Sequence, residues 1–208
     1  MLTFRQALES EKKIIEDILT LPFMDYPFFK IFEPDTVKRE KFIRSLQSIE
    51  INTNLKRGQL FAGIDENGKI VLAATFHNPN IKQAGNFEYL CEGYFSAMIK
   101  CGFSKILSWA KMYDFCRKPL ETLPKPLYYF ENLTVRTDSQ GKGCGGQFIK
   151  NFLLPYVKQN GGGTIAFITN SESNVKFYTN KGFQCFNYDT YSYKNIKLEN
   201  WCFKMEVK

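Results

Sequence analysis

The sequence contains few of the residues that bind metal ions. Its 208 residues include a single histidine, His77, and six cysteines that are widely spaced and never form a Cys-x-x-Cys pair. Structural zinc sites need clustered cysteine and histidine ligands, so we expect no metal. Most of the cysteines are expected to be small buried side chains, and none is expected to form a disulfide bond.

Long apolar segments and dense basic runs are also missing. No stretch reaches the roughly 18 apolar residues of a membrane helix, and the N-terminal MLTFRQALESEKK lacks the apolar core of a signal peptide. We therefore expect a cytoplasmic protein that does not contact a membrane. The net charge of +7 is spread thinly along the chain, which argues against nucleic acid as a partner.

What the sequence does contain is many aromatic residues, among them twenty phenylalanines and eleven tyrosines. This composition predicts a large apolar interior or groove, and the length suits one domain over residues 1–208. The basic excess lies towards the C-terminus, because residues 127–208 carry ten basic and six acidic side chains whereas residues 1–80 are balanced. The C-terminal part is therefore suited to a polyanionic cofactor.

Hydrophobic periodicity and turn residues predict an α/β fold, a mixed sheet with helices on both faces. Helices are expected at 9–21, at 36–54 with Asp35 as N-cap, in an insert at about 86–118 that Gly102 divides, and at 174–181. Strands are expected at 2–7, 59–64, 69–76, 127–135, 164–169, 184–191 and 201–207.

The organising stretch is Leu127–Tyr156, which is predicted to be a strand, a glycine-rich loop and a helix. Four glycines lie in the loop, and Phe148 and Phe152 share one face of the helix that follows. A loop of this kind leaves several N–H groups unpaired at the positive end of a helix dipole, which favours a bound phosphate.

Two common phosphate loops do not fit. Gly141-x-Gly143-x-x-Gly146 matches the dinucleotide fingerprint formally, but Thr137–Ser139 separates it from the strand, and no carboxylate follows about 20 residues later. Too few residues follow for the rest of a doubly wound domain. The Walker loop is excluded because no Gly-Lys-Ser/Thr sequence occurs here.

A third pattern fits better. Gln140-x-x-Gly143-x-Gly145 follows Leu133-Thr134-Val135 and resembles the pyrophosphate-binding motif of the GCN5-related N-acetyltransferases. A second segment at the spacing of that family comprises Asn174–Tyr178 and then Lys181-Gly182-Phe183. The segment 73–79, the helical insert and Leu154-Pro155 resemble the puromycin N-acetyltransferase-like branch.

The resemblance implies a mostly antiparallel sheet of six to seven strands whose fourth and fifth strands splay apart. It also implies acetyl-coenzyme A as co-substrate, with no metal, and transfer of its acetyl group to an amine in a ternary complex. The backbone of the strand would polarise the thioester carbonyl, and the loop would bind the pyrophosphate. The cofactor-binding residues would be Leu133, Thr134, Val135, Gln140, Gly141, Lys142, Gly143, Cys144, Gly145, Gly146, Asn170, Asn174, Phe177 and Tyr178.

Two residues are predicted to be catalytic. In the family a tyrosine at the position of Tyr178 protonates the departing thiolate, a task for which a neutral phenol is suited. Glu131 lies on the same strand face as Tyr129 and Val135, where a carboxylate needs either a wet cleft or a partner. Glu131 is interpreted as the base, as an acceptor-ammonium ligand or as part of a buried ion pair, with a water relay as another route to the base. Asn174 is expected to cap its helix, and His77 to lie on the surface or a pocket wall.

The acceptor is expected to be a small amine, and the protein a monomer or a homodimer. Pro22–Asp35, which is rich in aromatic residues and proline, is interpreted either as a packed loop or as a wall of the acceptor pocket. Two alternative functions stay open at this point, a non-catalytic acyl-coenzyme A sensor and a protein or peptide N-acetyltransferase.

Overall fold

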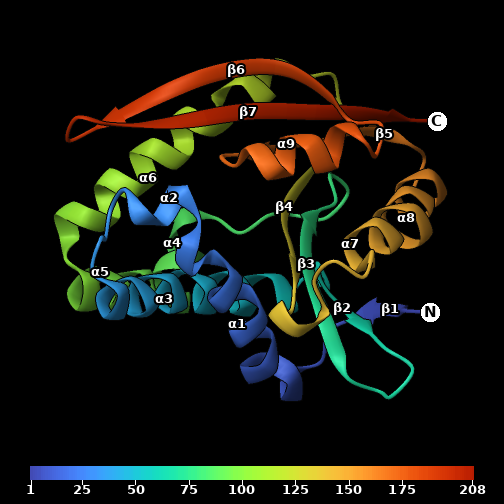
Figure 1. The fold of residues 1–208 in the computed structure, drawn as a ribbon, viewed down its shortest axis with the longest axis horizontal. Coiled ribbons are helices and arrows are strands. Elements are labelled where there is room, and N and C mark those ends of the chain that lie inside the picture. The colour runs from blue at the N-terminus through green and yellow to red at the C-terminus, as the bar shows by residue number, and fades with distance from the viewer.

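The computed structural model describes residues 1–208 and contains one seven-stranded sheet with the strand order β1-β2-β3-β4-β5-β7-β6 (Figure 1). Neighbouring strands are antiparallel except for β4 and β5, which are parallel. The strands are β1 (Thr3–Gln6), β2 (Leu60–Ile64), β3 (Ile70–His77), β4 (Leu127–Val135), β5 (Gly163–Thr169), β6 (Gln184–Tyr193) and β7 (Ile196–Val207).

The helices include those predicted from the sequence and several short ones. In the longest, the Asp35 carboxylate accepts a 2.8 Å hydrogen bond from the Lys38 N–H, as expected of an N-cap. The helices are α1 (Lys12–Thr20), α2 (Pro27–Lys30), α3 (Thr36–Leu55), α4 (Asn86–Tyr89), α5 (Phe95–Cys101), α6 (Phe103–Arg117), α7 (Cys144–Phe148), α8 (Leu154–Gln159) and α9 (Glu172–Thr179). A π-helical turn at Ile149–Leu153 joins α7 to α8.

Helices cover both faces of the sheet, because alternate residues of its strands point to opposite sides. On one face the α7–α8 segment packs Phe148 and Phe152 against Phe61 and Phe76 of the sheet. On the other face α1 and α3 cover a second cluster, in which Leu60, Ala62 and Ala73 come from the strands. The expected mixed sheet with helices on both faces is confirmed.

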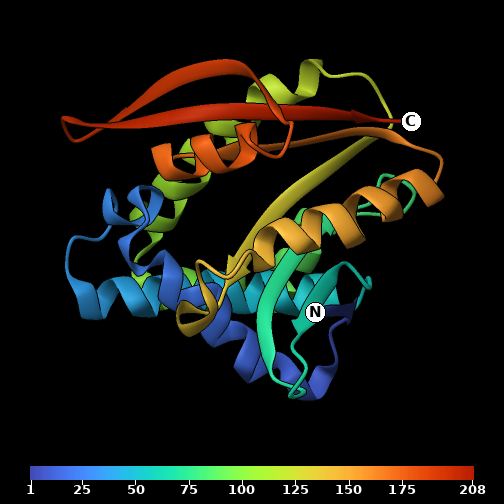
Figure 2. The ribbon, with the colours of Figure 1, turned by 45° about the vertical axis from the view of Figure 1, so that its right-hand side comes forward.

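Strands β4 and β5 separate soon after they begin. Their pairing is limited to Leu127–Tyr129 on β4 and Thr164–Ala166 on β5, and Figure 2 shows the two strands diverging from that end. β4 continues to pair with β3 as far as Val135, so only its β5 side is left open. The splayed strands that the family resemblance implied are therefore present.

Two sequence predictions about elements were wrong in detail. Residues 192–200 were not assigned to a strand, yet β6 and β7 form a long hairpin around Lys194 and Asn195, which have φ angles of 46° and 64°. Helix α9 begins at Glu172, with Ser171 as its N-cap residue, so Asn174 lies inside the helix and does not cap it.

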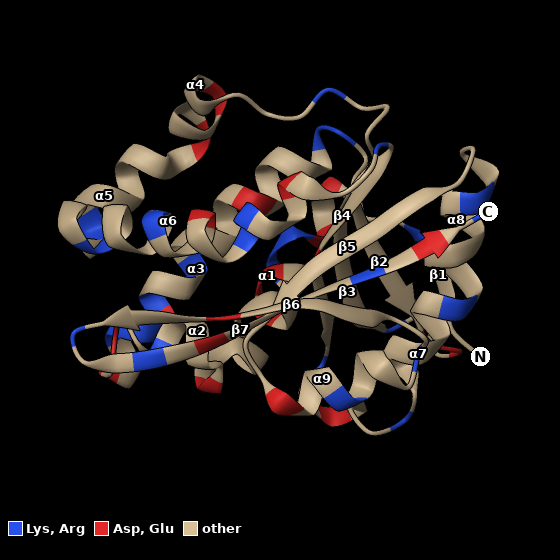
Figure 3. Ribbon diagram, turned by 90° about the horizontal axis from the view of Figure 1, so that it is seen from above, with Lys and Arg blue, Asp and Glu red and all other residues tan.

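No helix is long and apolar enough to cross a membrane. Acidic and basic positions are interspersed along the helices and the β6–β7 hairpin (Figure 3).

Candidate active site

A cavity of about 770 Å³ occupies the space between the diverging strands. At one end, which we call the loop end, it is lined by Ser139–Gly141, Gly143–Gly145 and residues of α9. At the other, which we call the aromatic end, it is lined by Phe23, Tyr26, Phe28, Trp109, Tyr113, Glu50 and Glu131. The open side of β4 runs between the two ends.

The loop end presents unpaired backbone donors. The N–H groups from Gly141 to Gly146 donate none of the turn and loop hydrogen bonds of the chain. Gly143 has a φ angle of 76°, which a residue with a side chain adopts only under strain. A Cβ on Gly145 would lie 3.3 Å from the ring of Phe177, so the loop and α9 approach closely. These features suit an anion bound by the backbone.

The loop is held to β4 by its own side chains and backbone. Gln140 donates a 3.0 Å hydrogen bond to the carbonyl of Val135, and Lys142 donates a 2.9 Å bond to the carbonyl of Asp138. Cys144 is buried and its thiol donates to the Ser139 carbonyl at 3.6 Å, so this cysteine fixes the loop. Lys142 is exposed and does not line the cavity.

The β5 side of β4 between Glu131 and Val135 has no partner strand. A strand edge of this kind leaves alternate N–H and C=O groups free to bond to a ligand. Leu133, Thr134 and Val135 line the cavity along this edge. The strand segment whose backbone the family resemblance assigned to the thioester therefore lines the cavity.

Helix α9 contributes Asn174, Phe177 and Tyr178 to the wall opposite β4. Asn174 donates a 3.1 Å hydrogen bond to Thr169 Oγ1. The ring of Tyr178 packs 4.2 Å from that of Phe167, and its burial, together with nearby Tyr26, raises the pKa of the phenol above its ordinary value. Tyr178 is consequently neutral and carries a proton at physiological pH.

Glu131 lies at the aromatic end and is held ionised by its neighbours. Its Oε2 is 2.8 Å from Nε2 of His77, and its Oε1 accepts a 2.6 Å hydrogen bond from Tyr113. Burial by itself would raise the pKa of Glu131, but His77, Tyr113 and the guanidinium of Arg117 outweigh burial and lower that pKa. Arg117 stacks behind this group, 4.1 Å from the ring centre of Tyr129. His77 was expected on the surface or a pocket wall; it is instead the partner of Glu131.

A second carboxyl group, that of Glu50, faces the same point from helix α3. One carboxylate oxygen each of Glu50 and Glu131 and a ring nitrogen of His77 all lie within 4.8 Å of one another. Burial and the nearby charge of Glu131 raise the pKa of Glu50 well above its ordinary value. The pKa values of the two carboxyl groups therefore shift in opposite directions, down for Glu131 and up for Glu50.

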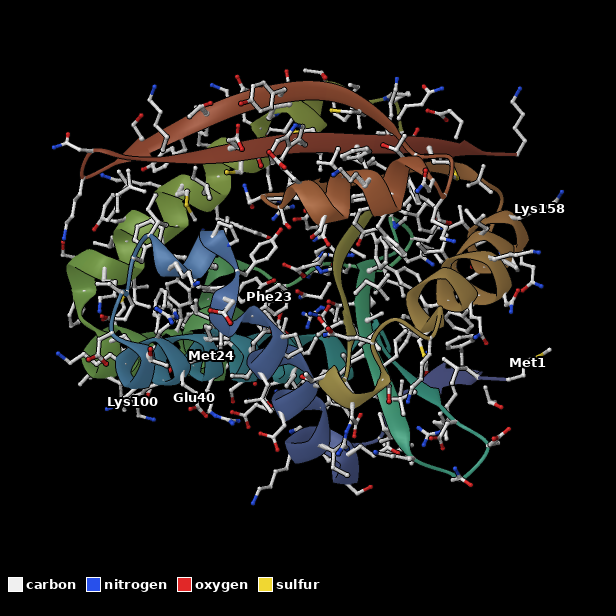
Figure 4. The ribbon with its side chains drawn as sticks, in the orientation of Figure 1. Met1, Phe23, Met24, Glu40, Lys100 and Lys158 are labelled. Carbon is white, nitrogen blue, oxygen red and sulfur yellow. The ribbon has the colours of Figure 1, made fainter.

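The walls of the aromatic end are flat and apolar. Trp109 and Tyr113 are stacked with their ring centres 5.3 Å apart, and Phe28 meets both rings edge-on at 6.1 Å. Phe23, which also lines the cavity, lies in the short 3-10 turn Leu21–Asp25. Figure 4 labels Phe23 and Met24 of this turn. Pro22–Asp35 was interpreted as a packed loop or a pocket wall, and seven of its residues, Pro22, Phe23, Asp25, Tyr26, Pro27, Phe28 and Phe29, line the cavity.

The structure brings most of the predicted site residues together around this cavity. Gly146 does not line it, because that glycine faces the side chain of Lys181, and Lys142 lies outside as well. The predicted residues that do line it are Glu131, Leu133, Thr134, Val135, Gln140, Gly141, Gly143, Cys144, Gly145, Asn170, Asn174, Phe177 and Tyr178. Glu50, Tyr113 and Trp109 were not predicted, since nothing in their local sequence distinguishes them from ordinary helix residues.

No protein-family model matches the sequence, and the search of curated proteins found no match. Solved structures do match. The chain is similar to the C-terminal condensation domain of Ebony in complex with β-alanyl-dopamine, with a TM-score of 0.71 and 11% identity over 100% of this chain and 99% of that one.

Two further structures are similar over 100% of both chains. One is the mosquito arylalkylamine N-acetyltransferase like 5b, with a TM-score of 0.63 and 17% identity. The other is the Drosophila melanogaster polyamine N-acetyltransferase, which catalyses the formation of N-acetylagmatine, with a TM-score of 0.60 and 16% identity. The chain thus has the fold of the GCN5-related N-acetyltransferases.

Proposed function

We propose that the protein is an acetyl-coenzyme A-dependent N-acetyltransferase that acts on a small amine by direct transfer in a ternary complex. The observation that carries this proposal is the single cavity between β4 and β5, which joins a backbone anion site at one end to a buried carboxylate at the other. Similar structures act on polyamines and arylalkylamines, which supports the same class of acceptor here.

In this proposal, different residues carry out different parts of the reaction. The Gly141–Gly146 loop binds the pyrophosphate, and the free edge of β4 at Leu133–Val135 orients and polarises the thioester. Glu131 lies two residues before Leu133, about 7 Å along the strand. This separation leaves room for an amine between the Glu131 carboxylate and a thioester carbonyl bound at Leu133–Val135. Tyr178 delivers a proton to the sulfur of the departing coenzyme A.

Two other functions compete with this proposal. A non-catalytic acyl-coenzyme A sensor would need the loop end but not the ionised Glu131 or the aromatic end. A protein or peptide N-acetyltransferase would need an open groove, whereas the aromatic end here is bounded by Phe28, Trp109 and Tyr113. Membership of the puromycin N-acetyltransferase-like branch stays a prediction.

The test combines a binding measurement with a turnover measurement. Isothermal titration should show that acetyl-coenzyme A binds, and release of free thiol should follow when amines, polyamines or aminoglycosides are added. Absence of acetyl-coenzyme A binding would overturn the proposal. Binding without thiol release from any amine would favour the sensor.

A further inference from the structure

The charged residues that line the cavity are all acidic. Among the residues that line it, Asp25, Glu50 and Glu131 are the only charged ones, and none is lysine, arginine or histidine. Asp25 lies at the rim, where its side chain is 88% exposed and pairs with Lys30. The aromatic end therefore holds two carboxyl groups, those of Glu50 and Glu131, between aromatic walls, and their cationic neighbours His77 and Arg117 lie behind the lining residues.

We propose that Glu50 and Glu131 together bind the ammonium group of an acceptor that carries a single cation on an aromatic body. This inference rests on the proposed acetyltransferase function and names both an additional acceptor-binding residue, Glu50, and the substrate class. The two carboxyl groups approach the same point from helix α3 and strand β4, within 4.8 Å. An ammonium group placed there would bond to one oxygen of each.

The raised pKa of Glu50 fits this role. In the empty site, two carboxylates this close repel each other, and a proton on Glu50 removes the repulsion. A bound ammonium supplies the same positive charge, so the site exchanges the Glu50 proton for the acceptor. The titratable groups that face Glu50 are Glu131 and Tyr129 on β4, His77 on β3, Tyr113 and Arg117 on α6, Tyr89 on α4, and Tyr94 just before α5.

The walls favour an aromatic body over a second cation. Phe28, Trp109 and Tyr113 present faces and edges that suit another ring, and contacts of this kind add to the free energy of burying it. A linear diamine would place its second ammonium among these rings without a buried carboxylate to pair with. Burying an unpaired charge is costly, so diamines should be poor acceptors.

Three amines test the substrate class by thiol release with acetyl-coenzyme A. They are 2-phenylethylamine, n-butylamine and 1,4-diaminobutane, which separate the effect of the ring from that of the second charge. We expect kcat/KM to be about tenfold or more higher for 2-phenylethylamine than for n-butylamine, because the ring buries several more carbon groups. The diamine should be the poorest. Equal or better turnover of 1,4-diaminobutane would overturn the inference.

The variant Glu50→Gln tests the residue. It should raise KM for 2-phenylethylamine about tenfold or more, as expected for a lost charge-assisted hydrogen bond, and leave acetyl-coenzyme A affinity unchanged. The matched control is Glu40→Gln, the same change on the same helix at an outer position paired with Arg44 (Figure 4). An unchanged KM in Glu50→Gln would overturn the role of Glu50.

Direct calorimetry keeps the inference testable even if no amine is acetylated and the proposed function fails. Titration of 2-phenylethylammonium in buffers of different ionisation enthalpy should show release of about one proton in the wild type and none in Glu50→Gln. No heat of binding, or equal proton release in both proteins, would contradict the inference.

A metal test is separate. Loss of turnover in EDTA with recovery in Zn²⁺ would assign Glu50, His77 and Glu131 to a metal site, and would also overturn the inference.

Discussion

The hydroxyl of Tyr113 donates a 2.6 Å hydrogen bond to Oε1 of Glu131 and so joins helix α6 to strand β4 at the aromatic end of the cavity. The bond stabilises the charged form of a buried carboxylate, together with His77 and Arg117. Removing the bond should therefore shift the titration of Glu131 and not only its position.

Tyr113→Phe should move the acid limb of the pH profile of kcat/KM to higher pH. A hydrogen bond to a charged group contributes about 1.5–3 kcal/mol, which corresponds to about one to two pH units. The direction of the shift follows because Glu131 loses a hydrogen-bond donor that stabilises its charged form. The effect of burial, which raises the pKa of Glu131, is then less strongly opposed. If the maximum of kcat/KM falls but the pH midpoint of the acid limb is unchanged, Tyr113 acts by packing alone.

Tyr178→Phe should lower kcat about 100-fold, the loss typical of a missing general acid, while the dissociation constant of acetyl-coenzyme A stays unchanged. The measurement pairs steady-state kinetics with isothermal titration. Tyr128→Phe is the matched control, since Tyr128 is also buried but donates its hydroxyl to the Asn160 carbonyl away from the cavity. Equal turnover in the two variants would remove Tyr178 from the mechanism.

Gly143→Ala should weaken acetyl-coenzyme A binding, whereas Gly68→Ala should not. Both glycines have a φ angle of 76°, and at both an added Cβ would meet open space. The cost in stability should therefore be similar, about 1–2 kcal/mol for placing an L-residue in the left-handed region. Only Gly143 belongs to the loop end of the cavity. Calorimetric affinities and urea unfolding of both variants separate binding from stability, and equal affinities would argue against pyrophosphate binding by the loop.

Glu50→Gln should flatten the dependence of stability on pH. Burial and Glu131 raise the pKa of Glu50 in the folded protein above the ordinary value of about 4.3, so above that pH the folded state binds more protons than the unfolded chain and stability falls as pH rises. The slope from this one group is at most about 1.4 kcal/mol per pH unit. Urea unfolding of both proteins between pH 5 and 7 measures the difference. Parallel curves would show that Glu50 is ionised in the folded protein.

Phe148→Ala should lower the free energy of unfolding by about 3–5 kcal/mol, because it leaves a cavity in a packed core. Phe148 is fully buried and its ring lies within 6.5 Å of those of Phe4, Phe76 and Phe130. Phe87→Ala, at a side chain that is 79% exposed, should change stability by less than about 0.5 kcal/mol. If the two variants lose similar amounts of unfolding free energy, Phe148 does not belong to the packed core.

Local sequence predicted most of the strands, the glycine-rich loop and the anion site at the loop end of the cavity. A run of aromatic and branched residues predicted β4 over Leu127–Val135, and the residue before a helical pattern predicted the N-cap at Asp35, because both depend on neighbouring residues. The glycines of the loop and their distance from the strand likewise indicated an anion site from sequence alone. These features arise within short segments, where backbone angles and turn chemistry leave few alternatives.

Tertiary structure alone decided the aromatic end. Glu50, His77, Tyr113 and Glu131 come from four elements, and no spacing along the chain indicates that their side chains meet. The charge state of each carboxyl group depends on those neighbours: Glu131 gains His77 and Tyr113 as partners, while Glu50 faces Glu131. A pKa shift arises from burial and nearby charge, and both exist only once the chain has folded.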